Sequence, residues 1–220
     1  MGENKTIAEN KLFKLMEVKN GNSLKEIESL IVQGVDINSV NKEGLTPLLY
    51  LLKQSNEKGN LTEVLQLLFN HGADIKTIDD NGNNALHYVC QYYQNDNLIE
   101  IIRLLIKYGV EVNQKTKYGS TALQFLCQYY QNDNLIEIVR LLIEHGVDVK
   151  AIDSFRYTAL ISLCENYQKE NLIEILELLI KYGGNVNTKG RFHARDFIRD
   201  KYSNKNKDEI LNLLDGETSA

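Results

Sequence analysis

The chain has 220 residues, with 25 Lys and Arg against 30 Asp and Glu, and a formal net charge of −5 at pH 7. Its 43% hydrophobic and 25% charged residues are typical of a folded globular protein and exclude a disordered chain or a collagen-like fibre. Because cations are not in excess and both signs are interspersed, we expect no nucleic acid as partner.

The sequence contains no segment typical of membrane insertion or secretion. No apolar run reaches the ~18 residues that span a bilayer, and the first ten residues hold no apolar stretch typical of a secretory signal. We therefore expect a cytoplasmic protein with no membrane partner.

A pattern that returns about every 37 residues organises the chain. Each of its glycines is followed by a short segment of the type VDIN, ADIK, VEVN, VDVK or GNVN. Periods of 20–50 residues indicate stacked units, each of which buries its apolar face only against its neighbours. The recurring glycines are Gly34, Gly72, Gly109, Gly146 and Gly183.

Each unit is expected to begin with a hairpin-like finger. Its tight turn contains Gly44, Gly82 or Gly119, since glycine tolerates the backbone angles of such turns. In the fourth unit the finger reads DSFRYT and has Arg156 at the glycine position. Either this turn is of another type, or a residue other than glycine adopts an unfavourable backbone angle.

Two helices follow the finger in each unit. The short one is expected over 47–52, 85–90, 122–127 and 159–164, after the N-cap residues Thr46, Asn84, Thr121 and Thr158. The longer one is amphipathic, and the recurring glycine ends it in a left-handed conformation. Its predicted N-caps, each with a Glu three residues later in a capping-box pattern, are Ser23, Asn60, Asn97, Asn134 and Asn171.

The segments TPLL (46–49), NALH (84–87), TALQ (121–124) and TALI (158–161) resemble the Thr-Pro-Leu-His signature of ankyrin repeats. The resemblance implies an all-α ankyrin-repeat solenoid that forms one continuous domain. It contains a degenerate N-terminal capping repeat (1–40), four full repeats and a degenerate C-terminal capping repeat (191–220), in which Asn206, Glu209 and Gly216 continue the pattern. The full repeats are 41–79, 80–116, 117–153 and 154–190, together 41–190.

These repeats exceed the family's usual 33 residues by four, which lie between Cys90 and Asn97 and at equivalent places. The stretch CQYYQNDNLIEI occurs unchanged at 90–101 and 127–138, and we interpret it as a duplicated structural unit. Its tyrosine pairs either stack between repeats or line a binding face. Because the third copy keeps only Tyr167, we expect the second tyrosine to pack and the first to be available for binding.

Residue types that carry chemistry have structural interpretations. Cys90, Cys127 and Cys164 occupy equivalent positions and are predicted to fill the core rather than to bind metal. His71 and His145 alternate with tyrosines before the glycines and are predicted at exposed helix ends. The pair Asp79-Asp80 is predicted to form a solvated turn. With no catalytic motif in the sequence, we expect no enzyme activity, cofactor or metal.

The resemblance implies a monomeric, non-catalytic scaffold that binds a protein of unknown identity through a concave face of finger tips and short helices. The predicted protein-binding residues are Lys42, Glu43, Leu45, Asp80, Asn81, Asn83, Gln91, Tyr92, Lys117, Tyr118, Ser120, Gln128, Tyr129, Ser154, Phe155, Arg156 and Tyr157, and the short helices further offer Lys53, Glu165 and Asn166.

Two alternatives stay open. The chain is a secreted or viral effector or decoy that binds a host protein in the host cytosol, or it is a regulatory ankyrin fragment of a larger enzyme or channel. The degenerate end repeats argue against the fragment, because capping repeats terminate a solenoid.

Overall fold

The structure is a computed structural model, and it describes residues 2–17, 23–55, 60–186, 193–202 and 206–216. Over these residues the chain is all-helical, as predicted, and an isolated antiparallel bridge joins Lys115 and Thr121. None of the described helices has both the length and the apolar character that crossing a membrane requires.

The chain divides into two compact units, Met1–Glu111 and Val112–Ala220, which we describe separately. The first contains α1 (Gly2–Glu17), α2 (Ser23–Val32), α3 (Pro47–Lys53), α4 (Leu61–Asn70), α5 (Ala85–Tyr92) and α6 (Leu98–Lys107). The second contains α7 (Ala122–Tyr129), α8 (Leu135–Glu144), α9 (Ala159–Asn166), α10 (Leu172–Lys181), α11 (Ala194–Lys201) and α12 (Lys207–Gly216). The predicted repeat boundaries and the single continuous domain stay predictions.

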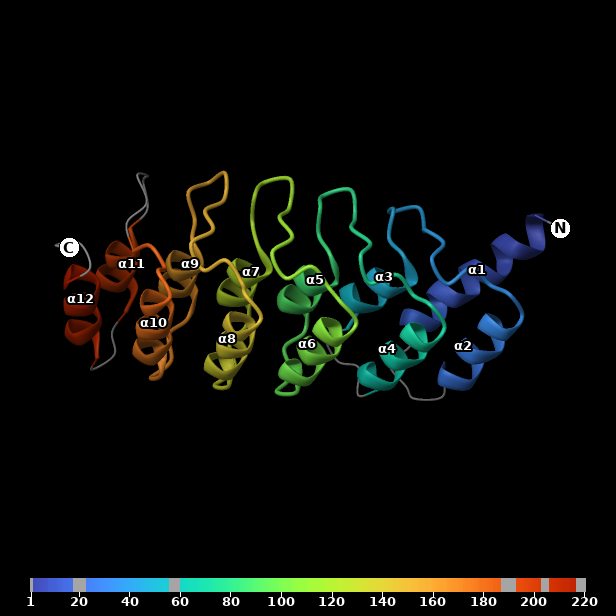
Figure 1. Cartoon of the computed structure of the whole chain (residues 1–220), viewed down its shortest axis with the longest axis horizontal. Helices are drawn as coiled ribbons and strands as arrows, with labels where there is room; N and C mark the ends of the chain where they lie inside the picture. The colour runs from blue at the N-terminus through green and yellow to red at the C-terminus, as the bar shows by residue number, and fades with distance from the viewer. Residues whose placement is uncertain (1, 18–22, 56–59, 187–192, 203–205, 217–220) are drawn as a thin grey trace. The chain divides into compact units, whose positions relative to one another are not determined.

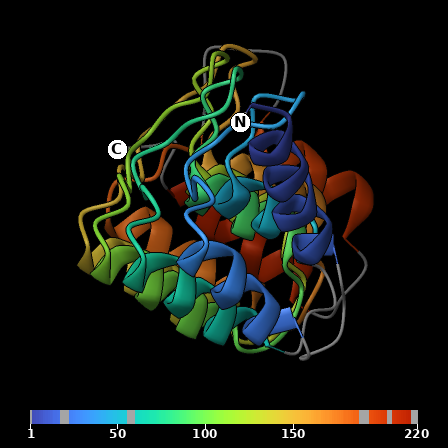
Figure 2. The same ribbon diagram turned by 90° about the vertical axis from the view of Figure 1, so that its right-hand side faces the viewer.

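Within each unit the helices form two layers, and loops project from one edge as fingers (Figures 1 and 2). In the first unit α3 packs between α1 and α5, and α2 packs against α4; in the second α9 packs between α7 and α11, and α10 packs between α8 and α12. The order of finger, short helix, loop and longer helix is therefore confirmed. Both predicted capping repeats contribute a pair of helices, although Gly216 is the last residue of α12 rather than the residue after it.

The short helices of the inner layer begin where the sequence predicts. Thr46, Thr121 and Thr158 each accept a hydrogen bond from the backbone N–H three residues later. Asn84 accepts from the backbone N–H groups of Leu86 and His87. The side chains of His87 and Gln124 in turn accept from the backbone N–H of the cap residue, which completes capping boxes in α5 and α7. The helices α5, α7 and α9 extend two residues further than predicted, past the cysteine, and so take up part of the insertion, whereas α3 extends by one residue.

The longer helices of the outer layer end as predicted. Gly72 has φ of 85° and Gly109 has φ of 89°, values that glycine adopts with little strain. After α4, the N–H of Gly72 donates to the oxygen of Phe69 and the N–H of Ala73 donates to that of Leu68. This pair of bonds is a Schellman motif, which supplies donors to the last free carbonyl groups of the helix.

The beginnings of the outer helices differ from the prediction. The side chains of Asn60, Asn97, Asn134 and Asn171 make no capping hydrogen bond to the helix. Three of these amide oxygens instead accept from a tyrosine hydroxyl four residues earlier: Tyr93 to Asn97 at 2.7 Å, Tyr130 to Asn134 at 2.8 Å, and Tyr167 to Asn171 at 2.8 Å.

The second tyrosine of each pair is therefore a core residue, as predicted, and does not line a binding face. Tyr93, Tyr130 and Tyr167 are at most 1% exposed, whereas Tyr129 is 37% exposed. In the second unit the hydroxyl of Tyr167 also reaches the carbonyl oxygen of Asn132 at 3.3 Å, and Tyr202 donates to that of Lys169 at 3.0 Å. The four additional residues are thus bonded to the neighbouring repeat.

The predicted finger turns share a side-chain cap that was not predicted. Three residues before each glycine position a side-chain oxygen accepts two backbone N–H bonds across the turn, as Asp79 does from Asn81 and Asn83, both at 2.8 Å. Short polar side chains stabilise turns in this way. The equivalent acceptors are Asn41, Thr116 and Asp153.

Arg156 adopts this same turn, so the second alternative for DSFRYT is the correct one. Its N–H donates to the oxygen of Asp153 at 3.0 Å, as that of Gly119 does to Thr116 at 2.9 Å. Arg156 has φ of 71°, close to the 79° of Gly119, and among the described residues other than glycine it alone has positive φ. The fourth finger therefore contains backbone strain that the other fingers avoid.

Asp79 is buried, contrary to the predicted solvated turn. Besides the two backbone bonds, it accepts from the side chain of Asn83 at 2.9 Å and from the hydroxyl of Tyr88 at 2.7 Å. Burial by itself raises the pKa of Asp79, but these hydrogen bonds outweigh burial and lower the pKa below its ordinary value. Asp80 is exposed, as predicted.

Replacing Tyr130 with Phe should lower the free energy of unfolding by about 1–2 kcal/mol, because the side chain of Asn134 loses this buried donor. Urea unfolding followed by circular dichroism measures the change. The matched control is Tyr129→Phe, which keeps the ring contact with Phe125 and should stay within about 0.5 kcal/mol of the wild type. Equal effects of the two variants would contradict the assigned role of the second tyrosine.

Replacing Arg156 with Gly should stabilise the protein by about 0.5–1 kcal/mol. Relief of the left-handed conformation contributes about 1–2 kcal/mol, and the greater freedom of glycine in the unfolded chain offsets part of it. Gly119→Ala makes the opposite change at the equivalent position and should cost about 1 kcal/mol. The same urea titration measures both, and an Arg156→Gly variant no more stable than the wild type would refute the strain.

Replacing Asp79 with Asn should destabilise the protein by about 1–3 kcal/mol at pH 7, because the new amide nitrogen faces donors. The pKa of Asp79 in the folded protein lies below its unfolded value of ~4. Its contribution is therefore complete above about pH 4 and is lost as the pH falls through the folded pKa.

The difference between wild type and Asp79→Asn should accordingly shrink on acidification, and urea unfolding at pH 7 and at pH 3 tests this. Asp80→Asn removes the neighbouring exposed charge and should show little difference at either pH. A difference for Asp79→Asn that is constant with pH would mean that its carboxylate is not held by these bonds.

Candidate protein-binding site

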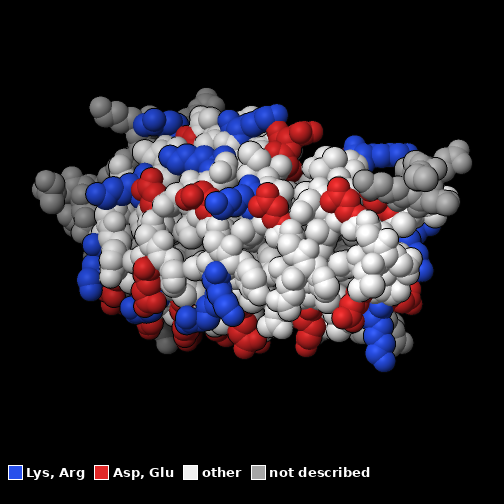
Figure 3. Space-filling model, turned by 45° about the vertical axis from the view of Figure 1, so that its right-hand side comes forward, with Lys and Arg blue, Asp and Glu red and all other residues white. Residues whose placement is uncertain are grey.

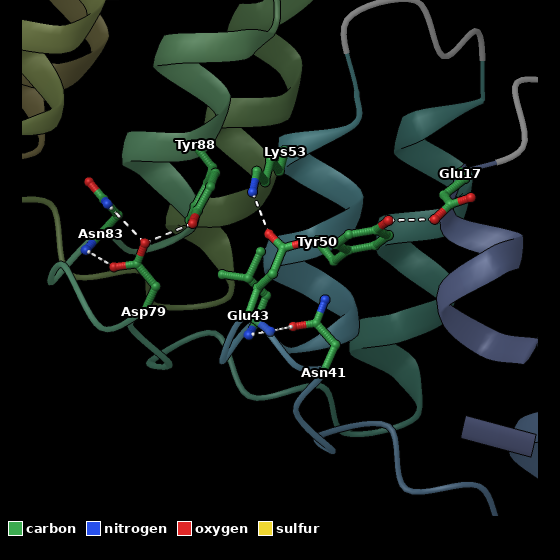
Figure 4. Close-up of polar contacts among 9 residues, drawn as sticks. Glu17, Asn41, Glu43, Tyr50, Lys53, Asp79, Asn83 and Tyr88 are labelled. Atoms are coloured by element: carbon green, nitrogen blue, oxygen red, sulfur yellow. Dashed lines mark hydrogen bonds and ion pairs between the residues drawn. The ribbon is translucent and has the colours of Figure 1, made fainter. Parts of the chain in front are cut away.

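The predicted binding residues of the first unit lie around the two fingers next to α3 and α5. Figure 4 shows this region, in which Glu43 forms an ion pair with Lys53 of α3, with 2.6 Å between Nζ and Oε2. Tyr50, also on α3, donates to Glu17 of α1. That hydrogen bond, then burial and the Glu17 charge, raise the pKa of Tyr50 to about 12.

Most of these residues are accessible, but one prediction is wrong. Lys42, Glu43, Asp80 and Asn81 are exposed. Leu45 is only 2% exposed, because the residue after the turn glycine points into the core before the cap of α3. It therefore belongs to the hydrophobic core and not to the binding surface.

The other predicted residues of the first unit are half-buried, and two of them contact neighbouring side chains. Asn83 is half-buried and donates to Asp79. Gln91 and Tyr92 are half-buried at the end of α5, where the Tyr92 ring stacks on Tyr88 with 6.0 Å between centroids. This surface therefore presents mainly charged and amide groups.

The second unit presents a different surface, with aromatic side chains at the finger tips. Tyr118 is 58% exposed and Phe155 is 61% exposed. Their rings lie 5.6 Å apart between centroids with a tilt of 40°, so the two fingers hold a joint aromatic patch. Lys117, Ser154 and Arg156 are exposed around it, as predicted.

A groove of about 390 Å³ lies beside this patch. It brings together five predicted residues, Ser120, Gln128, Phe155, Tyr157 and Glu165. Its other lining residues come from α7, α9 and the turn of the fourth finger: Gln124, Phe125, Asp153 and Ser162. The predicted residue Tyr129 is exposed at the end of α7, where its ring contacts Phe125 edge-on.

The groove exists where one repeat lacks a ring. The fourth residue after the inner-helix cap is Tyr50, Tyr88 and Phe125 in successive repeats, but Ser162 in the fourth. Ser162 is 3% exposed and lines the groove. The loss of the ring at this position is a signal in the sequence for the groove, but it lies inside a helix and not at a position expected at the surface.

The groove has acidic and aromatic walls. Asp153 accepts from the hydroxyl of Ser120 at 3.1 Å, and Glu165 has Lys201 at 3.7 Å on a largely exposed side chain. Burial first, and then the charge of Glu165 and a hydrogen bond to it, raise the pKa of Tyr157 to about 12. Neither Lys nor Arg is among the lining residues.

The charge around these surfaces is mixed. Figure 3 shows Lys and Arg side chains interspersed with Asp and Glu, with uncharged residues between them, over the face that it presents.

The residue types considered for chemistry have the predicted structural positions. Cys90, Cys127 and Cys164 are at most 2% exposed and are not in disulfide bonds, and burial raises the pKa of the Cys127 thiol to about 12. His71 and His145 are exposed C-cap residues of α4 and α8. A search of the described residues for three or more His, Cys, Asp or Glu in a metal-binding arrangement finds none.

The comparison with curated proteins finds no matching sequence. The family model described as ankyrin repeats (three copies) matches residues 15–116 and 92–190, two overlapping segments that cover most of the chain. The two-layer helical units, the inner-helix caps and the left-handed glycines agree with this match. The chain belongs to the ankyrin-repeat family.

Proposed function

We propose that this protein is a non-catalytic scaffold that binds a partner protein through the aromatic patch and the adjacent groove of the second unit. Ankyrin repeats are generally protein-protein interaction modules, and the family is typically non-catalytic. The exposed pair Tyr118 and Phe155, held 5.6 Å apart above the groove, is the single observation that carries the proposal.

Physical chemistry favours this surface over the others. Two neighbouring aromatic rings in water form an apolar surface that a partner stabilises by covering it, at roughly 25 cal/mol per Å² buried. Aromatic and Arg side chains are also the types that dominate binding energy in protein interfaces, and Arg156 lies next to Phe155. The concave groove beside the patch offers a place for a partner side chain to become buried.

The first unit has a secondary role in this proposal. Its accessible residues are largely charged, and Glu43 is already paired with Lys53. Exposed ion pairs contribute little, at most about 1 kcal/mol. We infer that this surface steers and orients a partner, while the second unit provides most of the affinity.

Capture experiments with the full chain test the proposal. Partners captured from cell extract by the wild type should be lost from a Tyr118→Ala/Phe155→Ala variant. For a partner then purified, the affinity should fall at least about 30-fold, since two hot-spot residues contribute about 1–2 kcal/mol or more each. Calorimetry gives the affinity, and circular dichroism should show unchanged helicity.

The matched control is Tyr182→Ala, which removes another exposed aromatic ring, 48% exposed, at the end of α10. It should bind like the wild type. If partners bind both variants equally, the aromatic patch is not the binding surface.

A further inference from the structure

The groove between the third and fourth fingers has a specific chemistry, and the following inference rests on the proposed function and deepens it. We propose that the groove is a specificity pocket that accepts an arginine side chain of the partner protein.

The space for such a side chain results from the sequence of α9. Ser162 stands where the preceding repeats have Tyr50, Tyr88 and Phe125, so a ring is missing from an otherwise repeated position. Phe155 does not fill the space, because it is 61% exposed. The volume of about 390 Å³ is at the small end of the roughly 300–1,000 Å³ of ligand pockets, which suits one long side chain.

The charged side chains that line the groove are both carboxylates. Glu165 and Asp153 bring two carboxylates, and Gln128 brings an exposed amide. Asp153 uses one oxygen for the backbone of its turn and the other for Ser120. Glu165 accepts from the hydroxyl of Tyr157 and has Lys201 3.7 Å away, half exposed to solvent. A carboxylate has about four lone-pair sites, so Glu165 can accept further hydrogen bonds from a partner.

Ser162 adds a small polar group to the wall of the groove. The residue is 3% exposed and lines the groove. A serine hydroxyl can accept a hydrogen bond as well as donate one. A donor that enters the groove can therefore bond to this hydroxyl.

Arginine fits these groups better than other side chains. Its planar guanidinium combines several donors with the ability to stack on aromatic faces, whereas lysine is a compact, strongly hydrated point charge. Phe125, Phe155 and Tyr157 supply the rings, and Glu165 and Ser162 supply acceptors on the α9 side. An anionic side chain would meet two carboxylates instead.

Small probes test the pocket without a partner protein. N-acetyl-arginine methylamide, titrated into the isotope-labelled full chain, should shift the NMR signals of groove residues such as Ser162 and Gln128 saturably. N-acetyl-citrulline methylamide has nearly the same shape without the charge. Its affinity should be at least about tenfold lower, a factor that corresponds to about 1.4 kcal/mol. N-acetyl-glutamate methylamide should produce no saturable shift.

Three variants locate the effect. Ser162→Phe supplies the ring of the other repeats and should abolish arginine binding, while Glu165→Gln keeps the shape and should remove the preference for arginine over citrulline. Glu144→Gln removes one exposed charge on α8 and should bind the probe like the wild type. Because Glu165→Gln changes no packing, it tests the pocket even if Ser162→Phe fails to fold.

Equal binding of arginine and citrulline, or unchanged arginine binding by Glu165→Gln, would overturn the inference. If partner capture still depended on Tyr118 and Phe155 in that case, the arginine pocket would fail while the proposed function would stand. If the probe binds as expected but no partner depends on these two rings, the pocket stands and the proposed function fails.

Discussion

In a helical repeat each unit buries its apolar face only against its neighbours, so the connection between its two helices must keep both in register. Here the connection is four residues longer than is usual, and the constraint that holds it is a buried tyrosine hydroxyl. Tyr93, Tyr130 and Tyr167 fill the core below the connection and bond to the asparagine that begins the outer helix. Each ring adds apolar burial, and each hydroxyl finds the partner that a buried polar group needs.

This arrangement explains why one tyrosine of the duplicated stretch packs in the core while its neighbour is partly exposed. Adjacent tyrosines at the end of an inner helix point in different directions, so Tyr130 is buried while Tyr129 remains partly exposed. The asparagine oxygens that would ordinarily cap the helix are used by the tyrosines. The first turn of the outer helix is satisfied instead by bonds such as that from the N–H of Leu98 to the oxygen of Asn95.

Much of the fold follows from local rules that the sequence displays directly. The inner-helix caps and the glycines that end the outer helices were predictable because each depends on one residue type in one backbone conformation. The missing asparagine caps were not predictable, because the tyrosine hydroxyl that competes for the asparagine oxygen reaches it only once the connection has folded. Leu45 and Asp79 were misjudged for a similar reason: turn residues look exposed in sequence, but burial depends on the packing of the next helix.

The candidate site was predictable in part. Phe155, Arg156 and Tyr157 were identified because they depart from the pattern of the other fingers, and the structure places two of them on the groove. Ser162 was missed because a small polar residue inside a helix gives no signal by itself; its meaning lies in the aromatic residue that it replaces.

Departures from a repeat pattern arise from drift as well as from function, and their arrangement in space distinguishes the two. Drift on an unused surface would scatter over the fingers and helices. In this chain a strained Arg156, an exposed Phe155 and a ring replaced by Ser162 all belong to the fourth repeat, and the last two line the same groove. The first two raise the free energy of the folded chain, the one through its backbone angle and the other through apolar exposure. Under the proposed function, a bound partner would offset these costs by covering the ring and filling the groove.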